Sequence, residues 1–314
     1  MRNQFLRFLL LLSITFIKAQ DVQLFKINDS LSYQYQKPKF FDMFAYIPKD
    51  MRDFGHSVAH IQNKDALITT VASTIILLKA DQNLTNEAVR FANNIGLTQK
   101  YKYGFIGPFE VAPKDLNSAI YLTGNVFFVS VLSGSFLTYG KIKNNYRALN
   151  TSSELMEGLF SVALVTQSLK RITGRQSALK ANVPGGKWQF FPNLKTYQNN
   201  RAYYDSYPSG HVATLMTTIT ILSSNYPEKK WIKPVGYSML GILAFDMMQS
   251  EVHWASDYPL AVAIGYIIGK NVVNRRIKKL KNTTTLSKKK SNYKTHFTFA
   301  LQPNYKAIGL SLTF

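Results

Sequence analysis

Tyr207-Pro208-Ser209-Gly210-His211, followed by the apolar, Thr-rich run 212–222, is the stretch that decides how this chain is organised. Pro208 and Gly210 favour a turn, so a helix is predicted to begin at His211. A helix start offers unpaired N–H groups and the positive end of the helix dipole, which together favour an anion. Ser209 suits the capping position and has a hydroxyl to donate to an oxyanion, while His211 suits proton transfer near neutral pH. A capped helix with an incidental histidine explains these five residues equally well.

A second pair of residues favours a catalytic site. His253 and Asp257 lie four residues apart, on one helix face or around one turn. A carboxylate hydrogen-bonded to one imidazole nitrogen fixes the tautomer and leaves the other nitrogen free to attack an electrophile. If the segment that starts at His211 and the one that ends at His253 are antiparallel neighbours, the two histidines meet at one end of the pair.

Composition excludes several classes of site. The chain has 314 residues, no cysteine and a formal net charge of +21. Without cysteine there is no disulfide framework, thiolate chemistry or Cys-ligated metal. Residues 270–294 hold ten Lys or Arg and no Asp or Glu, which is typical of a solvated tail or of a segment on an anionic membrane. No nucleic-acid-binding module is recognisable, so nucleic acid is not an expected partner.

Residues 1–19 have the features of a secretory signal peptide. Arg2 and Arg7 precede an apolar run of about ten residues, and the small residue Ala19 follows. The run is shorter than the ~20 residues that span a bilayer. Cleavage near Ala19 places the mature protein outside the cytoplasm, in the periplasm; an uncleaved anchor is the alternative.

The rest of the chain is predicted to be all-α apart from its end. Apolar periodicity predicts helices over 65–78, 85–95, 118–139, 154–169, 211–224, 233–250 and 257–274. The connections include a Gly/Pro-rich loop at 104–113 and a long loop at 176–206. A loop of ~30 residues inside a compact domain is usually functional.

These elements suggest a division into segments. We predict an extracytoplasmic N-terminal region with accessory helices at 20–117, a helical catalytic domain at 118–275 and a basic linker at 276–295. Residues 296–314 alternate apolar and polar side chains around Pro303-Asn304, which predicts a small C-terminal β-hairpin.

The basic residues also bear on membrane association. Three connections rich in Lys and Arg, 141–147, 229–233 and the block after Lys270, lie at the helix ends opposite the two histidines. This distribution obeys the positive-inside rule if the active-site ends face outward. It favours a membrane-associated helical bundle with membrane lipids as partners. A soluble exported bundle is the alternative, because the helix at 211–224 is short and rich in Thr.

The motifs Pro208-Ser209-Gly210-His211 and His253-x-x-x-Asp257, with Lys170 upstream at a helix end, resemble those of the type 2 phosphatidic acid phosphatase (PAP2) superfamily. That superfamily also contains vanadium haloperoxidases and bacterial acid phosphatases. The resemblance covers roughly residues 118–275. It implies a PAP2-like helical bundle with its site at one end, and a mechanism that needs no metal and no cofactor.

The resemblance also implies a role for each residue of the site. His253 is the nucleophile that forms a phospho-histidine, and Asp257 orients it. His211 is the general acid for the leaving group, and the backbone around Ser209 and Gly210 holds phosphate oxygens.

Two family motifs are incomplete in this chain. The first is Lys, six residues, then Arg-Pro, but counting from Lys170 leads to Ser177-Ala178. Either Arg175, two residues earlier, takes over the phosphate contact, or a cation is missing. The third motif has Ser-Arg seven and six residues before its His, where this chain has Asp246-Met247. Loss of one such contact typically costs ~10²–10³ in rate.

The long loop offers replacements for the missing cations. Arg201, Lys187 and Lys195 lie in the segment that leads into the His211 turn, and Arg201 is the preferred candidate for a phosphate ligand. The predicted function is a phosphatase that acts on a phosphomonoester or diphosphate, in particular a phosphorylated lipid. A catalytically degenerate lipid-binding or scaffold protein is the alternative, and a vanadium haloperoxidase is a third option that the loss of cations disfavours.

Overall fold

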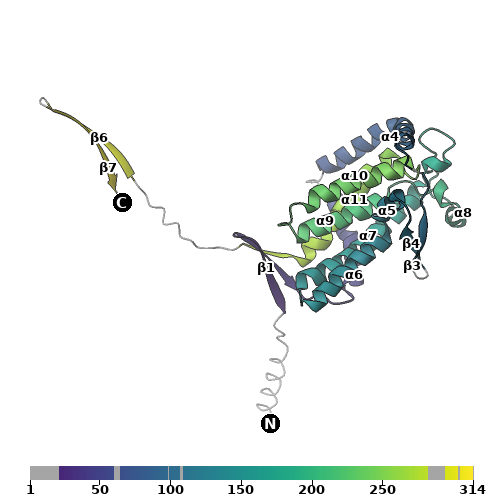
Figure 1. Ribbon diagram of the computed structural model, residues 1–314, viewed down its shortest axis with the longest axis horizontal. Coiled ribbons are helices and arrows are strands. Elements are labelled where there is room, and N and C mark those ends of the chain that lie inside the picture. The colour runs from purple at the N-terminus through teal and green to yellow at the C-terminus, as the bar shows by residue number, and fades with distance from the viewer. Residues whose placement is uncertain are drawn as a thin grey trace, which may run out of the picture.

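The computed structural model describes residues 21–59, 64–97, 99–106, 109–281, 294–302 and 305–313. The predicted signal peptide lies outside these residues, as does most of the predicted basic linker. The described part is mainly a helical bundle with small antiparallel sheets (Figure 1).

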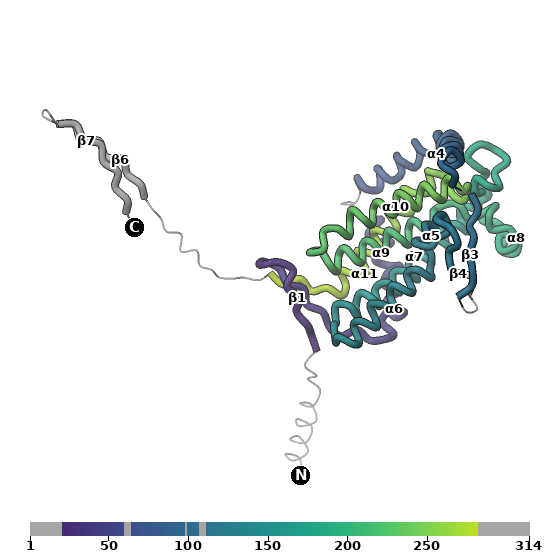
Figure 2. The backbone as a smooth tube through the Cα atoms, viewed as in Figure 1, coloured from purple at the N-terminus to yellow at the C-terminus, as the bar shows by residue number. Residues whose placement is uncertain are grey.

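The bundle consists of α4 (Lys64–Asn94), α6 (Val126–Ile142), α7 (Tyr146–Thr173), α9 (Gly210–Asn225), α10 (Ile232–Gln249) and α11 (Tyr258–Arg276). At its centre is α9, which packs against α7, α10 and α11. Helix α4 lies over α10 and α11 on the outside of the bundle (Figures 1 and 2). The three predicted helices from 211 onward are correct to within a few residues. The helices predicted at 65–78 and 85–95 are one helix, and the helix predicted from residue 154 begins at Tyr146.

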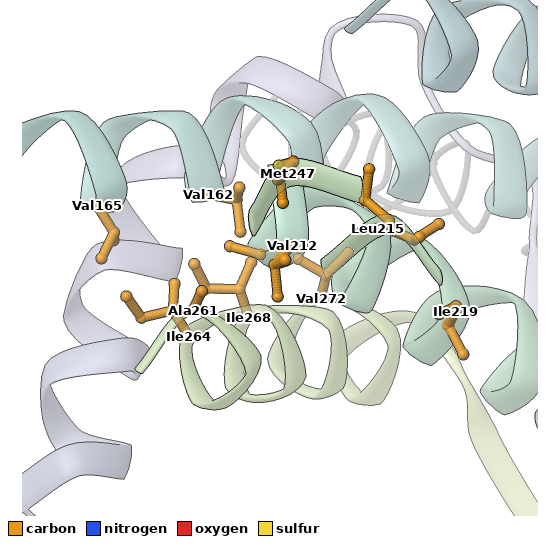
Figure 3. Packing of buried hydrophobic residues seen from close by; sticks show 12 residues of the cluster. Val162, Val165, Val212, Leu215, Ile219, Met247, Ala261, Ile264, Ile268 and Val272 are labelled. Atoms are coloured by element: carbon orange, nitrogen blue, oxygen red, sulfur yellow. The ribbon is translucent and has the colours of Figure 1, made fainter. Parts of the chain in front are cut away.

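Aliphatic side chains from four helices fill the core. Figure 3 shows Val162 and Val165 of α7, Val212, Leu215 and Ile219 of α9, Met247 of α10, and Ala261, Ile264, Ile268 and Val272 of α11. Gly265 lets α11 approach α9 closely, because a Cβ there would lie 2.4 Å from the carbonyl oxygen of Ala213. This close contact positions the site, since His211 is in the first turn of α9 and Asp257 immediately precedes α11.

The apolar run 118–139 is not one helix. Helix α5 (Leu116–Leu122) meets α6 at an angle of 65° across the break at 123–125. Asn125 starts α6 as its cap, since its side chain accepts the N–H of Phe127 at 3.1 Å. Within the described ranges, no single helix has the length and apolar character of a membrane span; the bent α5–α6 pair has them only when both helices are taken together.

A sheet that the sequence prediction lacks covers one end of the bundle. It contains β1 (Val22–Asn28), β2 (Leu31–Gln36) and β5 (Lys278–Lys281), in the order β1-β2-β5 with all neighbours antiparallel. Two short helices, α2 (Asp42–Ala45) and α3 (Ile47–Ala59), follow it. The hydroxyl of Tyr35 donates to Asn225 at the end of α9 (2.9 Å), and Arg147 at the start of α7 donates to Glu228 (2.8 Å). The basic connections at 141–147 and 229–233 therefore lie at this end, opposite the histidines, as predicted, and so does the basic block after Lys270 as far as Lys281, where its described part ends.

The other end carries loops and short elements. The predicted Gly/Pro-rich loop contains a hairpin of β3 (Tyr103–Ile106) and β4 (Phe109–Pro113). The long loop 176–206 contains α8 (Leu194–Asn199) and two 3-10 turns, η3 (Ala178–Lys180) and η4 (Arg201–Tyr203). Near the C-terminus, β6 (Lys294–Gln302) and β7 (Tyr305–Thr313) pair antiparallel, which agrees with the predicted hairpin.

Candidate active site

Helix α9 begins where the sequence predicts, directly after Ser209. The Ser209 hydroxyl caps the helix by accepting the N–H of Val212 (3.4 Å), and it lies 4.0 Å from the sulfur of Met247. The Ser209 N–H donates to the carbonyl oxygen of Asp257 (3.2 Å). Ser209 is fully buried, so it ties α9 to its neighbours and does not present its hydroxyl to an anion. The N–H groups of Gly210 and His211 lie in the first turn, where a helix provides no acceptor for them.

His253 and Asp257 come together as predicted, but around a turn instead of along a helix. After α10 the chain turns and enters the 3-10 turn η5 (Ala255–Asp257). Nδ1 of His253 lies 3.2 Å from Oδ2 of Asp257, and both residues are buried. Because Nδ1 is held by the carboxylate, Nε2 is the nitrogen available for chemistry.

The Asp257 carboxylate has several donors. Its Oδ2 also accepts the Ser206 hydroxyl (2.6 Å) and the Trp254 N–H (2.9 Å), and its Oδ1 accepts Arg175 (2.6 Å). Burial favours a higher pKa for Asp257, but the Arg175 charge and the hydrogen bonds from His253 and Ser206 outweigh it and lower the pKa to about 2. Asp257 is therefore ionised at neutral and mildly acidic pH, and it stabilises positive charge on His253.

Arg175 lies behind this pair, away from the reactive nitrogen. Gly174 ends α7 in the left-handed conformation (φ 52°), where a Cβ would lie 1.9 Å from the carbonyl oxygen of Gln189. Only glycine fits this sharp turn, which directs Arg175 into the interior. The guanidinium is completely buried between the rings of Trp188 and Trp254, 4.8 and 5.5 Å from their centroids.

Both terminal nitrogens of Arg175 are fully used. Nη1 donates to Asp257 and to the Ser256 hydroxyl, both at 2.6 Å. Nη2 donates to Asp81 of α4 (2.6 Å) and to the carbonyl oxygen of Gly185 (2.9 Å). No N–H of these two nitrogens is left for a phosphate, and the Nε–H, which has no partner, is buried with the rest of the guanidinium. Arg175 therefore fixes Asp257, in place of the phosphate contact predicted for it.

Lys170 and Arg201 are the cations beside the site. Lys170 is buried in the last turn of α7, and this burial lowers its pKa. The negative charges of Asp205 and Asp257 oppose that shift and the positive charge of Arg201 adds to it, so all three lie near the ammonium group. Arg201 is exposed in η4. The N–H of Ser177, just after α7, donates to the carbonyl oxygen of Ala202 (2.9 Å), and this hydrogen bond holds η4 against the end of α7.

The second histidine, His211, packs against the junction of α5 and α6. Its ring lies 4.1 Å from the Tyr121 ring, and a Cβ at Gly124 would lie 2.7 Å from the Cβ of His211. Burial, together with the charges of His253 and Lys170, lowers the pKa of His211 to about 3. His211 is therefore neutral near pH 7 when no anion is bound.

Asp246 and Met247, at the positions of the absent Ser-Arg, supply no cation. Met247 is fully buried. Asp246 accepts the Tyr101 hydroxyl and the Gln249 amide, both at 3.1 Å. Burial outweighs these two hydrogen bonds and raises the pKa of Asp246 to about 6. Positive charge for an anion must therefore come from the side of Lys170 and Arg201.

The site is a pair of imidazoles with cations on one side and the start of α9 on another. A held imidazole with a free nitrogen, next to a second imidazole, suits nucleophilic attack with proton transfer to a leaving group. Within the described segments, no group of three or more His, Asp or Glu side chains is arranged to hold a metal ion. The sequence prediction missed Asp81, Ser206 and Tyr121. Of these three, only Ser206 could have been suspected from the sequence, because it directly precedes the Tyr207–His211 stretch.

Comparison with known proteins gives one family match and one curated relative. Residues 153–280 match the family model of the PAP2 superfamily. Over 66 residues the chain is 32% identical to a lipid A 1-phosphatase of Porphyromonas gingivalis; this segment is 21% of the chain and 15% of that relative. The chain therefore matches only a small part of the length of this curated relative.

Two solved structures are similar to the chain. The crystal structure of Aquifex aeolicus LpxE aligns with a TM-score of 0.37 and 19% identity, over 50% of this chain and 83% of that one. The first transmembrane PAP2-type phosphatidylglycerolphosphate phosphatase from Bacillus subtilis aligns with a TM-score of 0.43 and 14% identity, over 66% of this chain and 94% of that one.

Proposed function

We propose that the protein is a phosphatase of the PAP2 superfamily, because residues 153–280 match the model of that family. It hydrolyses a phosphomonoester or diphosphate carried by a lipid, through a phospho-histidine intermediate. The observation that carries the proposal is the contact between Nδ1 of His253 and the ionised Asp257, with His211 and Lys170 beside it.

In the first half of the reaction, Nε2 of His253 attacks phosphorus. The N–P bond forms as the bond from phosphorus to the leaving oxygen breaks, and His211 donates a proton to that oxygen. Positive charge that develops on the His253 ring is balanced by Asp257.

In the second half, water attacks the phospho-histidine. His211, now neutral, takes a proton from the water while the N–P bond breaks and its electron pair returns to Nε2. His211 passes this proton to the phosphate, which leaves, and both histidines regain the states that they have in the free site. One imidazole thus serves as acid and then as base.

The phosphoryl oxygens need positive charge and N–H donors throughout the reaction. We assign this role to Lys170, Arg201 and the backbone N–H of Gly210 at the start of α9. Arg201 is supported by its charge interaction with Lys170 and by its exposure. Ser209 and Arg175 support this arrangement from the interior.

Apolar surface on α4 is an argument for a lipid substrate and for association of the protein with a membrane. Ile68, Ile75 and Ile76 are exposed by 62%, 52% and 67%, and a largely apolar groove of about 670 Å³ lies between α3, α4 and α11. Contiguous apolar surface of this kind marks membrane or protein contacts. An Ile68→Asp/Ile76→Asp variant should lose co-sedimentation with anionic vesicles while still hydrolysing a soluble aryl phosphate; unchanged sedimentation would contradict this part of the proposal.

The activity is tested by phosphate release in the presence of EDTA. Substrates are a lysophospholipid phosphate, a polyprenyl diphosphate and an aryl phosphate, and the variants are His253→Ala and, as matched control, His56→Ala, which changes an exposed histidine of α3. Wild type and His56→Ala should release phosphate, and His253→Ala should be inactive. Activity that survives in His253→Ala would exclude the phospho-histidine.

One observation favours a catalytically degenerate binding protein as the second candidate. The buried Met247 packs against Ser209 where the family has an arginine, so one phosphate contact is missing. A folded wild-type protein that binds phosphorylated lipid but releases no phosphate would support this candidate.

A further inference from the structure

We infer that Asp81 of α4, outside the segment that matches the family model, is a positioning residue of the reaction, acting on His253 through Ser256, Arg175 and Asp257. The inference rests on the proposed phosphatase activity. If it holds, the region before the family match contributes a residue that affects the rate of the reaction.

Asp81 contacts the catalytic turn directly. Its Oδ1 accepts the N–H of Ser256 (2.9 Å), and its Oδ2 accepts the Ser256 hydroxyl (2.6 Å). Asp81 is completely buried, and α4 packs against η5, which contains Ser256 and Asp257. The 3-10 turn that carries the nucleophile's partner is therefore held by a side chain from the outer helix.

Asp81 also contacts the turn through Arg175. The guanidinium donates through one nitrogen to Asp81 and through the other to Asp257, both at 2.6 Å. A buried charge is costly unless it is paired, and here one cation serves two carboxylates. The trio Asp81, Arg175 and Asp257 therefore carries a net charge of −1 (two carboxylates and one guanidinium).

This net charge matters for His253. If Asp257 alone paired with Arg175, the two charges would cancel and little negative potential would remain at the imidazole. Because Asp81 shares the guanidinium, Asp257 retains negative charge toward His253, where positive charge develops during attack. Asp81 thus contributes to transition-state stabilisation without touching substrate.

The test compares Asp81→Asn with Asp50→Asn in the full-length protein. Asp50 is a matched control at the opposite end of the bundle: it is also buried, lies 2.5 Å from Arg275 and accepts the Ser161 hydroxyl (2.7 Å). Both variants break a buried Asp–Arg–Ser contact, so both should lower the melting temperature. Only Asp81→Asn should lower kcat, by roughly 10- to 100-fold, the usual cost of losing a residue that orients a catalytic group. KM and inhibition by inorganic phosphate should change by less than about twofold, because Asp81 does not bind the phosphoryl group.

The outcomes separate this inference from the proposed function. Equal kcat in the two variants, or a loss that appears in KM alone, would overturn the role of Asp81 while wild-type activity stands. A wild-type protein without activity on any substrate would overturn the proposed function and this inference with it. If Asp81→Asn does not fold, Ser256→Ala keeps the Asp81–Arg175 ion pair and the contact of Asp81 with the Ser256 N–H, and removes the hydroxyl that bonds to both Asp81 and Arg175. It should lower kcat about tenfold with KM unchanged, and an unchanged kcat would refute the inference.

Discussion

Raising the pH above about 6 is predicted to lower kcat/KM about tenfold per pH unit, because the substrate carries the catalytic proton into the site. Burial and the charges of His253 and Lys170 hold the pKa of His211 at about 3. At pH 7, four units higher, about one unliganded molecule in 10⁴ has this histidine protonated. Protonating it costs about 5 kcal/mol at 1.36 kcal/mol per unit.

A phosphomonoester supplies both the proton and the charge that stabilises it. With a second pKa of about 6, about 10% of the substrate is monoanionic at pH 7 and about 1% at pH 8. Each negative charge about 4 Å from the imidazole stabilises its protonated form by about 4 kcal/mol at an effective dielectric constant of 20. A bound phosphoryl dianion therefore offsets the 5 kcal/mol, and the proton moves from the monoanion to His211.

The assay is kcat/KM across a pH series with two substrates, an alkyl phosphate and an aryl phosphate with a lower second pKa. The alkaline limb should move to lower pH with the aryl phosphate, since it reports the protonation of the substrate. A limb at the same pH for both substrates would belong to a group of the enzyme and would refute the role given to the monoanion.

Three substitutions test other parts of the site. Asp257→Asn should lower kcat by roughly 10⁴-fold, because an amide no longer fixes the tautomer of His253; a loss below tenfold in folded protein would show that Asp257 is not the orienting residue. Arg201→Ala should lower kcat/KM by about 10²-fold through loss of one cation on the phosphoryl group, whereas Lys195→Ala, in the exposed α8 of the same loop, should have no effect; equal effects would remove Arg201 from the site. Gly124→Ala should lower kcat by roughly 10²-fold, because the added Cβ would lie 2.7 Å from the Cβ of His211 and push that residue out of position. The control Gly134→Ala on α6, where a Cβ meets nothing within 4 Å, should leave kcat unchanged. Full activity of Gly124→Ala would contradict the placement of His211.

The sequence predicted those parts of the fold whose determinants are local. Ser209 and the turn before it determine the start of α9, and apolar periodicity determines α10 and α11. The division of α4 into two predicted helices has a physical cause, because the polar residues near Asp81 interrupt its apolar face. They do so where the helix reaches the site and Asp81 is paired with Arg175.

The strands β1 and β2, which were not predicted, have a local signal in the sequence. Tyr33 and Tyr35 are buried at alternate positions of β2, and Asn28-Asp29-Ser30 before them is typical turn sequence. This is the pattern of a hairpin with one face against the bundle.

The destination of Arg175 could not be predicted from local sequence. A cation two residues from a motif position suggests a phosphate ligand, but its partners Asp81 and Asp257 lie far away on both sides of it in the chain. Which way the side chain points depends on the left-handed turn at Gly174 and on the packing of α4 against η5. Both are properties of the assembled bundle.

The most direct measurement of the central claim is the trapping of the phospho-enzyme. Wild-type protein, His253→Ala and His56→Ala are mixed with a phosphate-labelled substrate and quenched with denaturant at alkaline pH, where phospho-histidine survives. Wild type and His56→Ala should carry label that is lost in acid, and peptide mapping should place it on the peptide that contains His253. Label that persists in His253→Ala, or that maps to another residue, would contradict the assignment of His253 as the nucleophile.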